Sequence, residues 1–149
     1  MKFDSGQIRA AACLLERERG SSVDPGDVGV REGIGFMGQS PDAVQHALVR
    51  AIEESLISPE DLPGAYFALG KRRDRALKGW FQQALRREAN HDSDTVYQIM
   101  IALDDLGEPV FDRTQRTGFS AREKEDNLRD ALKYLSRMNA GQVDGGERG

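Results

Sequence analysis

The sequence predicts an all-α fold of about six helices, arranged as a compact bundle or as a short stack of helical hairpins. Six stretches of the 149 residues carry apolar side chains at helical spacing, and helix-capping residues precede most of them. Alternation of apolar and polar residues, which would indicate strands, is scarce. A chain of this length fits one domain, so we expect a single helical domain over residues 1–138 and a disordered tail over residues 139–149.

The first predicted helix covers residues 5–19, and a glycine-rich loop follows it. Asp4 or Ser5 can cap this helix, and Gly20 ends it. Its inward stripe consists of Ile8, Ala11, Ala12 and Leu15. The loop over residues 21–39 holds five glycines, which disfavour a regular helix, and apolar residues that we expect to anchor it over the core.

Two further helices begin with the same chemistry: a serine cap, a proline in the first turn and nearby carboxylates. One begins at Ser40-Pro41-Asp42 and the other at Ser58-Pro59-Glu60-Asp61, where Pro63 is expected to break or shift the helix. The inward residues of the first are Val44, Ala47, Leu48, Ala51, Ile52 and Leu56. Those of the second are Leu62, Ala65, Tyr66 and Leu69.

The central element is a predicted helical hairpin over residues 71–111. Its first arm, residues 71–87, turns inward Leu77, Trp80, Phe81, Ala84 and Leu85. Its second arm, residues 93–107, turns inward Val96, Ile99, Met100, Leu103 and Leu106, and Gly107 with Pro109 ends it. Tyr97 and Ile101 widen the apolar surface of this arm, so we expect it to be the most buried helix.

The last predicted helix begins at a capping box formed by Ser120 and Glu123. Its inward residues are Leu128, Ala131, Leu132, Leu135 and Met138. The residues after Met138 are mainly small and polar, and this composition is the reason for expecting a disordered tail there.

The net charge of −4 hides a strongly uneven layout. Residues 71–87 have a net charge of +6, whereas residues 88–112 contain no lysine or arginine and have a net charge of −7. The basic segment places Lys71, Arg75, Lys78 and Arg86 on one predicted helix face, with Arg72, Arg73 and Arg87 flanking it. The acidic segment carries Asp92, Asp94, Asp104, Asp105, Glu108 and Asp112, which we select as the candidate partner-binding residues.

Asp104 and Asp105 break a local rule of helix stability. They lie at the C-terminal end of the second arm, where the helix dipole disfavours negative charge by ~0.3–1 kcal/mol per residue. Either a nearby arginine offsets them, or they serve a cationic partner outside the chain. The basic face is an alternative site for phosphate contacts, but the adjacent acidic arm would neutralise it or repel a nucleic acid.

Neither a cofactor nor a metal is predicted. Residues 33–38 match G-x-G-x-x-G, but no buried strand precedes them and the next helix begins at Pro41, beyond the motif. Cys13, His46 and His91 are too few and too scattered for a structural zinc site. Asp92, Ser93 or Asp94 is best explained as a helix cap. No catalytic signature is present, so we do not expect an enzyme.

The sequence also predicts a cytoplasmic protein. No apolar run approaches the roughly 18 residues that span a bilayer. The apolar segment near the N-terminus is too short for a signal peptide and is soon interrupted by Glu16 and Arg17. Cys13 is the only cysteine, which permits no internal disulfide and suits a reducing compartment.

Residues 102–111, ALDDLGEPVF, resemble the helical hairpins of HEAT-like repeats, in which a helix ending in such a run packs against its neighbour. In size, charge layout and the hairpin region at residues 92–111, the chain resembles the small helical immunity proteins of bacterial polymorphic toxin systems, including contact-dependent growth inhibition. This resemblance implies a protein that binds a cognate toxin domain and blocks its active site or substrate groove.

We therefore expect a protein-binding module that neutralises a cognate toxin through its acidic surface. One alternative is another protein-interaction inhibitor or adaptor, such as a phage-derived inhibitor of a defence complex. A second alternative is a nucleic-acid-binding regulator that uses the basic residues 71–87.

Overall fold

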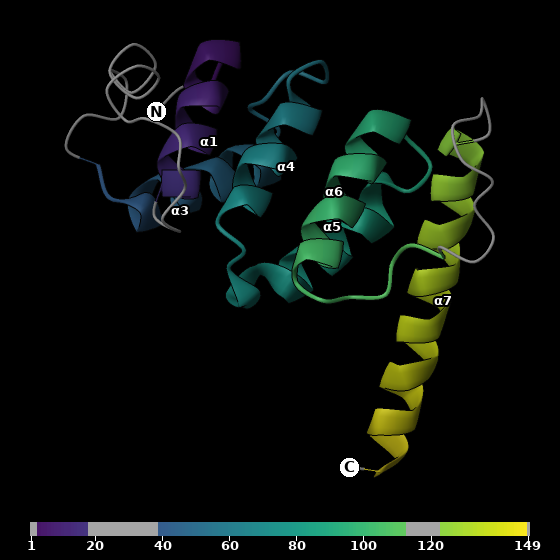
Figure 1. Cartoon of the computed structure of the whole chain (residues 1–149). Helices are drawn as coiled ribbons and strands as arrows, with labels where there is room; N and C mark the ends of the chain where they lie inside the picture. The colour runs from purple at the N-terminus through teal and green to yellow at the C-terminus, as the bar shows by residue number, and fades with distance from the viewer. Residues whose placement is uncertain (1–2, 18–38, 113–122, 149) are drawn as a thin grey trace. The chain divides into compact units, whose positions relative to one another are not determined.

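The computed structural model describes residues 3–17, 39–112 and 123–148, with the side chains of α7 described through residue 140. Within these ranges the chain forms six α-helices and one short 3-10 helix, and no strand (Figure 1). The predicted all-α class is therefore confirmed, while the glycine-rich loop falls outside the described residues. The chain divides into two compact units, residues 1–74 and 75–149, and each is described by itself. The single domain over residues 1–138 and disorder of the tail stay predictions.

The first unit packs three helices, α1 (Ser5–Arg17), α3 (Pro41–Glu53) and α4 (Leu62–Lys71). Each contacts the other two, and α1 and α4 form the most extensive pair. The predicted caps at the starts of α1 and α3 are present. An oxygen of Asp4 accepts the backbone N–H of Gln7 at 2.9 Å, and Ser40 Oγ accepts that of Ala43 at 3.1 Å.

The core of this unit follows the predicted helical stripes with four adjustments, one of which is that Leu62 is only half-buried. Its buried members from those stripes are Ile8, Ala11, Leu15, Val44, Leu48, Ala51, Ile52, Ala65, Tyr66 and Leu69. Ala12 and Ala47 are only half-buried. Leu56 was placed inward by the helical period, but it is 66% exposed. The reason is that α3 ends at Glu53 and Ser55 adopts a φ of 58°, so Leu56 no longer follows the helix and Ile57 is buried instead.

Helix α4 begins at Leu62, three residues after the proline that was expected to open it. Pro63 lies in the first turn, where its missing N–H costs no intrahelical hydrogen bond, so it shifts the start without breaking the helix. The carboxylate of Asp61 accepts hydrogen bonds from Ser58 Oγ at 3.0 Å and Ser5 Oγ at 2.7 Å. These contacts join the starts of α1 and α4.

The prediction of one continuous helix over residues 71–87 is wrong. Helix α4 ends at Lys71, a 3-10 turn η3 (Arg75–Leu77) follows, and only then does α5 (Lys78–Glu88) begin. Arg73 adopts a φ of 52°, in the left-handed region that a right-handed helix cannot continue through. The boundary between the two units falls immediately after, between Asp74 and Arg75.

The second unit is built around α6 (Ser93–Asp105), which packs against α5 and against α7 (Glu123–Arg148). All five residues that the sequence turns inward from the second arm are buried: Val96, Ile99, Met100, Leu103 and Leu106. On α5, Phe81, Ala84 and Leu85 are buried and Trp80 is half-buried, and Leu77 at the end of η3 is also half-buried. The helical hairpin is therefore present, with α5 as a shorter first arm.

Helix α6 begins and ends where the sequence predicts. Asp92 is the N-cap, and its carboxylate accepts the backbone N–H of Asp94 at 3.4 Å and the hydroxyl of Thr95 at 3.0 Å. At the other end Gly107 adopts a φ of 87° and donates its N–H to the carbonyl of Asp104 at 2.9 Å. The positive φ is accessible to glycine without steric cost, which explains why the helix ends here.

Helix α7 uses a slightly rotated stripe compared with the predicted one. Ala131, Tyr134 and Leu135 are buried, whereas Leu132 is 46% exposed and was wrongly placed inward. Tyr134 and Leu135 follow Ala131 by three and four residues and therefore lie on the same face of the helix, whereas Leu132 does not. The helix extends to Arg148, past the predicted end at Met138. Ser120 of the predicted capping box lies outside the described residues.

Replacing Gly107 with alanine should destabilise the protein, because an L-residue in left-handed backbone costs about 1–2 kcal/mol. Gly79→Ala is the matched control: Gly79 lies within α5, and an added Cβ would meet no atom within 4 Å. This second change should stabilise the protein by about 0.5 kcal/mol. Urea unfolding of both variants measures the difference, and equal stability of the two would contradict the assigned turn.

Candidate functional site

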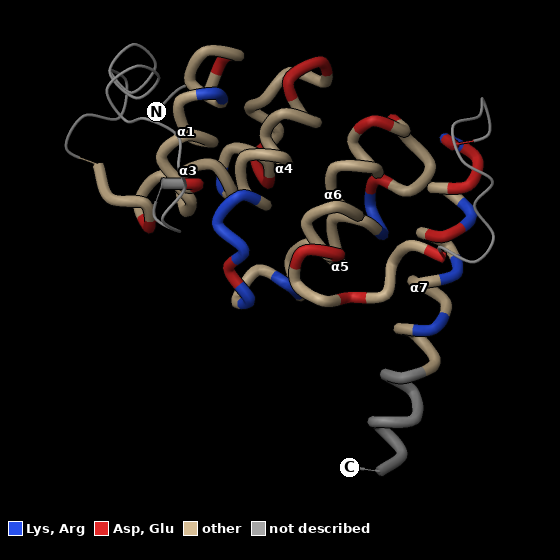
Figure 2. Tube along the Cα trace, in the orientation of Figure 1, with Lys and Arg blue, Asp and Glu red and all other residues tan. Residues whose placement is uncertain are grey.

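The six acidic residues selected from the sequence do not lie together. Asp92 and Asp94 are at the start of α6, and Asp104 and Asp105 are at its end (Figure 2). The helix contains 13 residues and rises ~1.5 Å per residue, so the two pairs are separated by roughly 18 Å. The closeness of these residues in the sequence suggested a single acidic patch. In the structure they form two groups at opposite ends of α6.

Glu108 is engaged in a polar network inside the second unit. Its carboxylate accepts a hydrogen bond from the hydroxyl of Tyr134 at 2.7 Å and forms an ion pair with Lys78 at 3.5 Å. Gln82 Nε2 lies 2.8 Å from the same hydroxyl and 3.5 Å from the carboxylate. The network joins α5, the segment after α6, and α7. Glu108 therefore has a structural role that the charge pattern alone did not indicate.

Burial raises the pKa of Tyr134 from its ordinary value of 10.0 to about 12. The hydrogen bond from Gln82 lowers this pKa, and the neighbouring Glu108 carboxylate raises it. The phenol consequently keeps its proton, and with it the hydrogen bond to Glu108, at any pH near neutrality.

Asp112 is likewise held by α7. Its backbone N–H donates to Oδ2 of Asp130 at 3.0 Å, and its carboxylate lies 3.3 Å from Lys133 Nζ. Asp130 is only 2% exposed and also contacts Arg129 at 3.4 Å. At the end of α6, Asp104 is half-buried and Asp105 is exposed, and neither is without an interaction partner in the protein. The acidic residues after α6 thus contribute to the fold.

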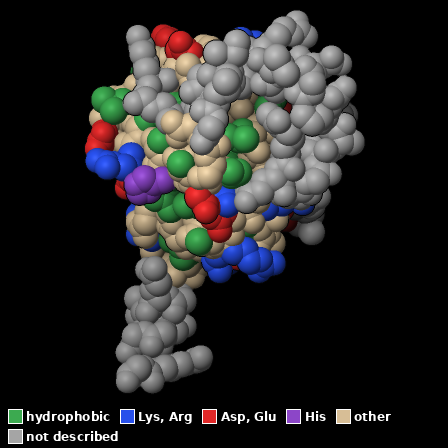
Figure 3. All heavy atoms as spheres, turned by 90° about the vertical axis from the view of Figure 1, so that its left-hand side faces the viewer, with side chains coloured by type: hydrophobic (Ala, Val, Ile, Leu, Met, Phe, Trp, Pro, Cys, Tyr) green, Lys and Arg blue, Asp and Glu red, His purple; other side chains and the backbone are tan. Residues whose placement is uncertain are grey.

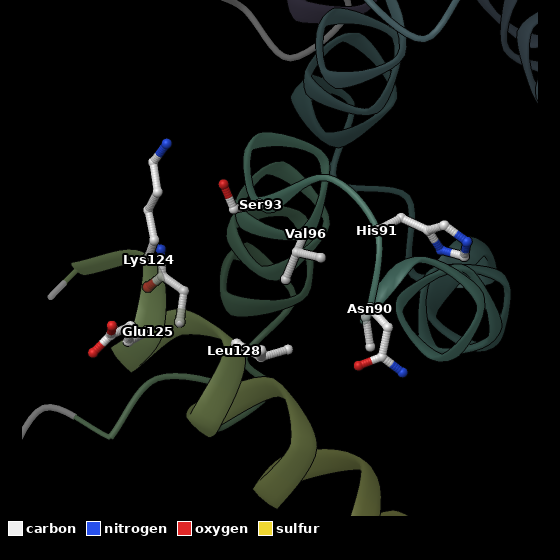
Figure 4. A pocket seen from close by; sticks show the side chains of 9 residues that line it. Asn90, His91, Ser93, Val96, Lys124, Glu125 and Leu128 are labelled. Carbon is white, nitrogen blue, oxygen red and sulfur yellow. The ribbon is translucent and has the colours of Figure 1, made fainter.

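Asp94 borders a cleft between the start of α6 and the start of α7, which we name the acidic cleft. Its main hollow measures about 280 Å³ (Figure 4). A second hollow of about 240 Å³ adjoins it and shares Ser93, Lys124 and Asn127. The main hollow is lined by Ala89, Asn90, His91, Ser93, Val96, Lys124, Glu125, Asn127 and Leu128. Asp94, Tyr97 and Glu123 complete the second one. Asp92, the cap of α6, lines neither of the hollows of this cleft.

Three exposed carboxylates line this cleft: Asp94, Glu123 and Glu125. Lys124 is the one lysine or arginine among the described residues that line the two hollows. Sequence reasoning missed Glu125 and assigned Glu123 only to helix capping. The available signal was the acidic first turn of α7, which holds Glu123, Glu125 and Asp126.

The predicted basic face does not exist as one helix face. Lys71 belongs to α4, Arg75 to η3, and Lys78 and Arg86 to α5. Lys71 pairs with Glu16 at 3.5 Å and lies 4.5 Å above the ring of Phe67. Lys78 pairs with Glu108, as described above, and Arg86 donates to Asn139 Oδ1 at 2.6 Å. The four cations are divided between the two units, and Lys71, Lys78 and Arg86 contact neighbouring side chains.

The flanking arginines are also paired within the protein. Arg72 bridges α4 to Asp42 of α3 at 2.6 Å, and Arg87 lies 3.6 Å from Glu88. Figure 3 shows one face of the molecule, on which acidic and basic side chains lie next to each other among hydrophobic ones. A phosphate-binding stripe therefore has little support from these contacts.

A hollow of about 290 Å³ in the first unit is the other candidate. It is lined by Ile8, Arg9, Ala12, Cys13, Glu16, Gly64, Phe67 and Lys71. Phe67 is 43% exposed, but the charges beside it are largely matched by the Lys71–Glu16 pair. This hollow lacks the charge imbalance that distinguishes the acidic cleft.

The residues that were weighed and set aside as cofactor or metal ligands give no further site. His91 is exposed and lies 3.9 Å from Glu88, and Asp92 acts as a helix cap. Among the residues that the structure describes, no three or more His, Cys, Asp or Glu side chains gather in a way that could hold a metal ion. Residues 33–38, with the glycine motif, lie outside the described ranges. None of the described helices combines the length and apolar character needed to cross a bilayer.

Comparisons with known proteins found no matching family model, no matching curated protein and no matching solved structure. The geometry and charge of the acidic cleft are therefore the basis for inferring a function.

Replacing Tyr134 with phenylalanine should lower the free energy of unfolding by about 1–2 kcal/mol, because Glu108 and Gln82 each lose a hydrogen-bond partner. The pH dependence should change as well. A pKa raised on folding stabilises the protein below pH 10 and loses that effect as the pH rises toward 12. Urea unfolding at several values of pH should therefore show a steeper alkaline loss in the natural protein than in the variant. Parallel pH curves would contradict the network.

Proposed function

We propose that this chain is a protein-binding module that holds a basic surface of a partner protein at the acidic cleft. The observation that carries the proposal is the group of three exposed carboxylates, Asp94, Glu123 and Glu125, in a cleft whose described lining holds one lysine. More specifically, we propose an immunity protein that acts in the cytoplasm and neutralises a cognate toxin domain.

The charge of the cleft favours a cationic partner for a simple reason. Exposed carboxylates attract Lys and Arg side chains over about one Debye length, ~8–10 Å at physiological salt. Such attraction accelerates association with a basic partner. The same carboxylates repel acidic proteins and nucleic acids, so they contribute more to specificity than to affinity. A cleft of this kind suits an inhibitor that must find one basic target quickly.

The mode of inhibition would be occupation of the target's own basic groove. A toxin domain that acts on nucleic acid needs cations to hold phosphates. An inhibitor that presents carboxylates to those cations excludes the substrate without any chemistry of its own. An adaptor, or an inhibitor of some other protein, could use the same surface, and the identity of the bound protein separates these roles.

The proposal is tested with the toxin domain encoded by the neighbouring gene, if there is one, using the full chain. Asp94→Lys together with Glu125→Lys reverses two rim charges and keeps Asp92 as the cap of α6. Two attractions of ~1 kcal/mol each become repulsions, so the dissociation constant should rise at least about tenfold. Most of that change should be in the association rate, and it should shrink at high salt.

The matched control is Glu53→Lys together with Glu60→Lys, two exposed glutamates of the first unit. It makes the same net charge change away from the cleft and should leave toxin binding and protection of toxin-expressing cells intact. Circular dichroism confirms that both variants fold. Equal loss in both variants, or no loss in the cleft variant, would overturn the assignment of the binding surface. A toxin domain that does not bind the natural chain would overturn the immunity function.

A further inference from the structure

The floor of the acidic cleft is apolar, and its charges lie on the rim. Ala89 and Val96 are buried and Leu128 is half-buried, yet all three line the main hollow. Figure 4 shows the side chains of Val96 from α6 and Leu128 from α7 in the space between these helices. The hollow has a volume of about 280 Å³, which is large enough to receive one aliphatic or aromatic side chain against this apolar floor.

The adjoining hollow has a different character. Asp94, Glu123 and Tyr97 line it together with the three residues that the two hollows share. A segment that crosses both hollows would therefore meet an apolar floor in one and carboxylates in the next. Lys124 lies on the shared wall, where it repels a cation and steers it toward Asp94 and Glu123.

We propose that the acidic cleft binds a protein segment in which an apolar side chain is flanked by lysine or arginine. The apolar side chain occupies the floor formed by Ala89, Val96 and Leu128, and a flanking cation pairs with Asp94 or Glu123. This inference depends on the proposed function, because it specifies the partner chemistry of that same surface.

Helix stability alone does not explain this arrangement. Carboxylates in the first turns of α6 and α7 interact favourably with the helix dipoles whether or not a partner binds. The dipoles do not require an apolar hollow between the two turns. Rim charges accelerate association, whereas burial of an apolar anchor slows dissociation, so the two parts have separable effects on binding.

The probes are three end-blocked hexapeptides added to the full, isotope-labelled chain and followed by NMR. The first has the order Lys-Leu-Lys-Lys-Leu-Lys, the second replaces leucine with serine, and the third replaces lysine with glutamate. Shifts caused by the first peptide should cluster at residues 89–97 and 124–128. The serine peptide should bind at least about fivefold more weakly, because it provides no apolar anchor, and the glutamate peptide should not bind.

Variants on α7 provide a matched pair. Leu128→Gln removes part of the cleft floor, whereas Leu132→Gln changes an exposed leucine on the same helix that does not line either hollow. The first should weaken the Lys/Leu peptide at least about fivefold, and the second should not change its affinity. Urea unfolding of both variants, together with binding measured well below the unfolding transition, separates lost binding from lost structure.

The outcomes are distinct from those of the proposed function. Equal binding of the leucine and serine peptides, shifts outside the cleft, or equal affinity in Leu128→Gln would overturn the apolar anchor. If toxin protection is lost in the rim-charge variant but kept in Leu128→Gln, the proposed function stands and this inference fails. If the peptides bind as expected but no toxin domain does, the inference stands and the immunity function fails.

Discussion

Burial of α6 between α5 and α7 is the constraint on which the second unit depends. A helix with apolar residues on most of its surface is stable only when neighbours cover it, and each fully buried aliphatic side chain contributes ~1.5–3 kcal/mol. Because α5 and α7 cover two sides of α6, polar groups of α6 reach water mainly at its two ends. Asp92 caps one end and Gly107 closes the other. The candidate site lies at the first of these ends.

The polar contacts of the second unit fix α7 against this core. Tyr134 contacts Glu108, and Asp130 contacts the backbone of Asp112, so two points of α7 hold the segment that follows α6. Both contacts involve carboxylates buried from water in large part, and such groups cost free energy unless they are hydrogen-bonded. The position of the first turn of α7, which forms one wall of the acidic cleft, therefore depends on contacts made further along the same helix.

Sequence reasoning predicted α6 correctly because its apolar period, its cap and its glycine stop all indicate the same element. It failed at residues 72–77, since no glycine or proline marks the left-handed backbone at Arg73. Leu56 was misplaced for a related reason, because the end of α3 depends on Ser55, which also lacks a distinctive local signal. Local patterns identify helix interiors, whereas these ends were set by tertiary packing.

The candidate site was predicted only in part. Asp94 was selected for its charge, but the carboxylates that share the cleft with it, Glu123 and Glu125, lie about thirty residues away in the chain. The distribution of charge along the sequence does not show that the starts of α6 and α7 lie close together, because it does not show which helices pack against each other. The same distribution grouped Asp104 with Asp92, although a helix keeps its two ends apart by its own length.

The role of Asp92 as the cap of α6, two residues before the cleft residue Asp94, has a consequence for how this surface can diversify. A change at Asp92 would lower helix stability without changing a residue that lines the cleft, so selection for a new partner would meet only a folding penalty there. Asp94, Glu123 and Glu125 have no comparable capping contact in the described structure. If lineages carrying this fold acquired different partners, variation should accumulate at those three positions while the aspartate at 92 persists.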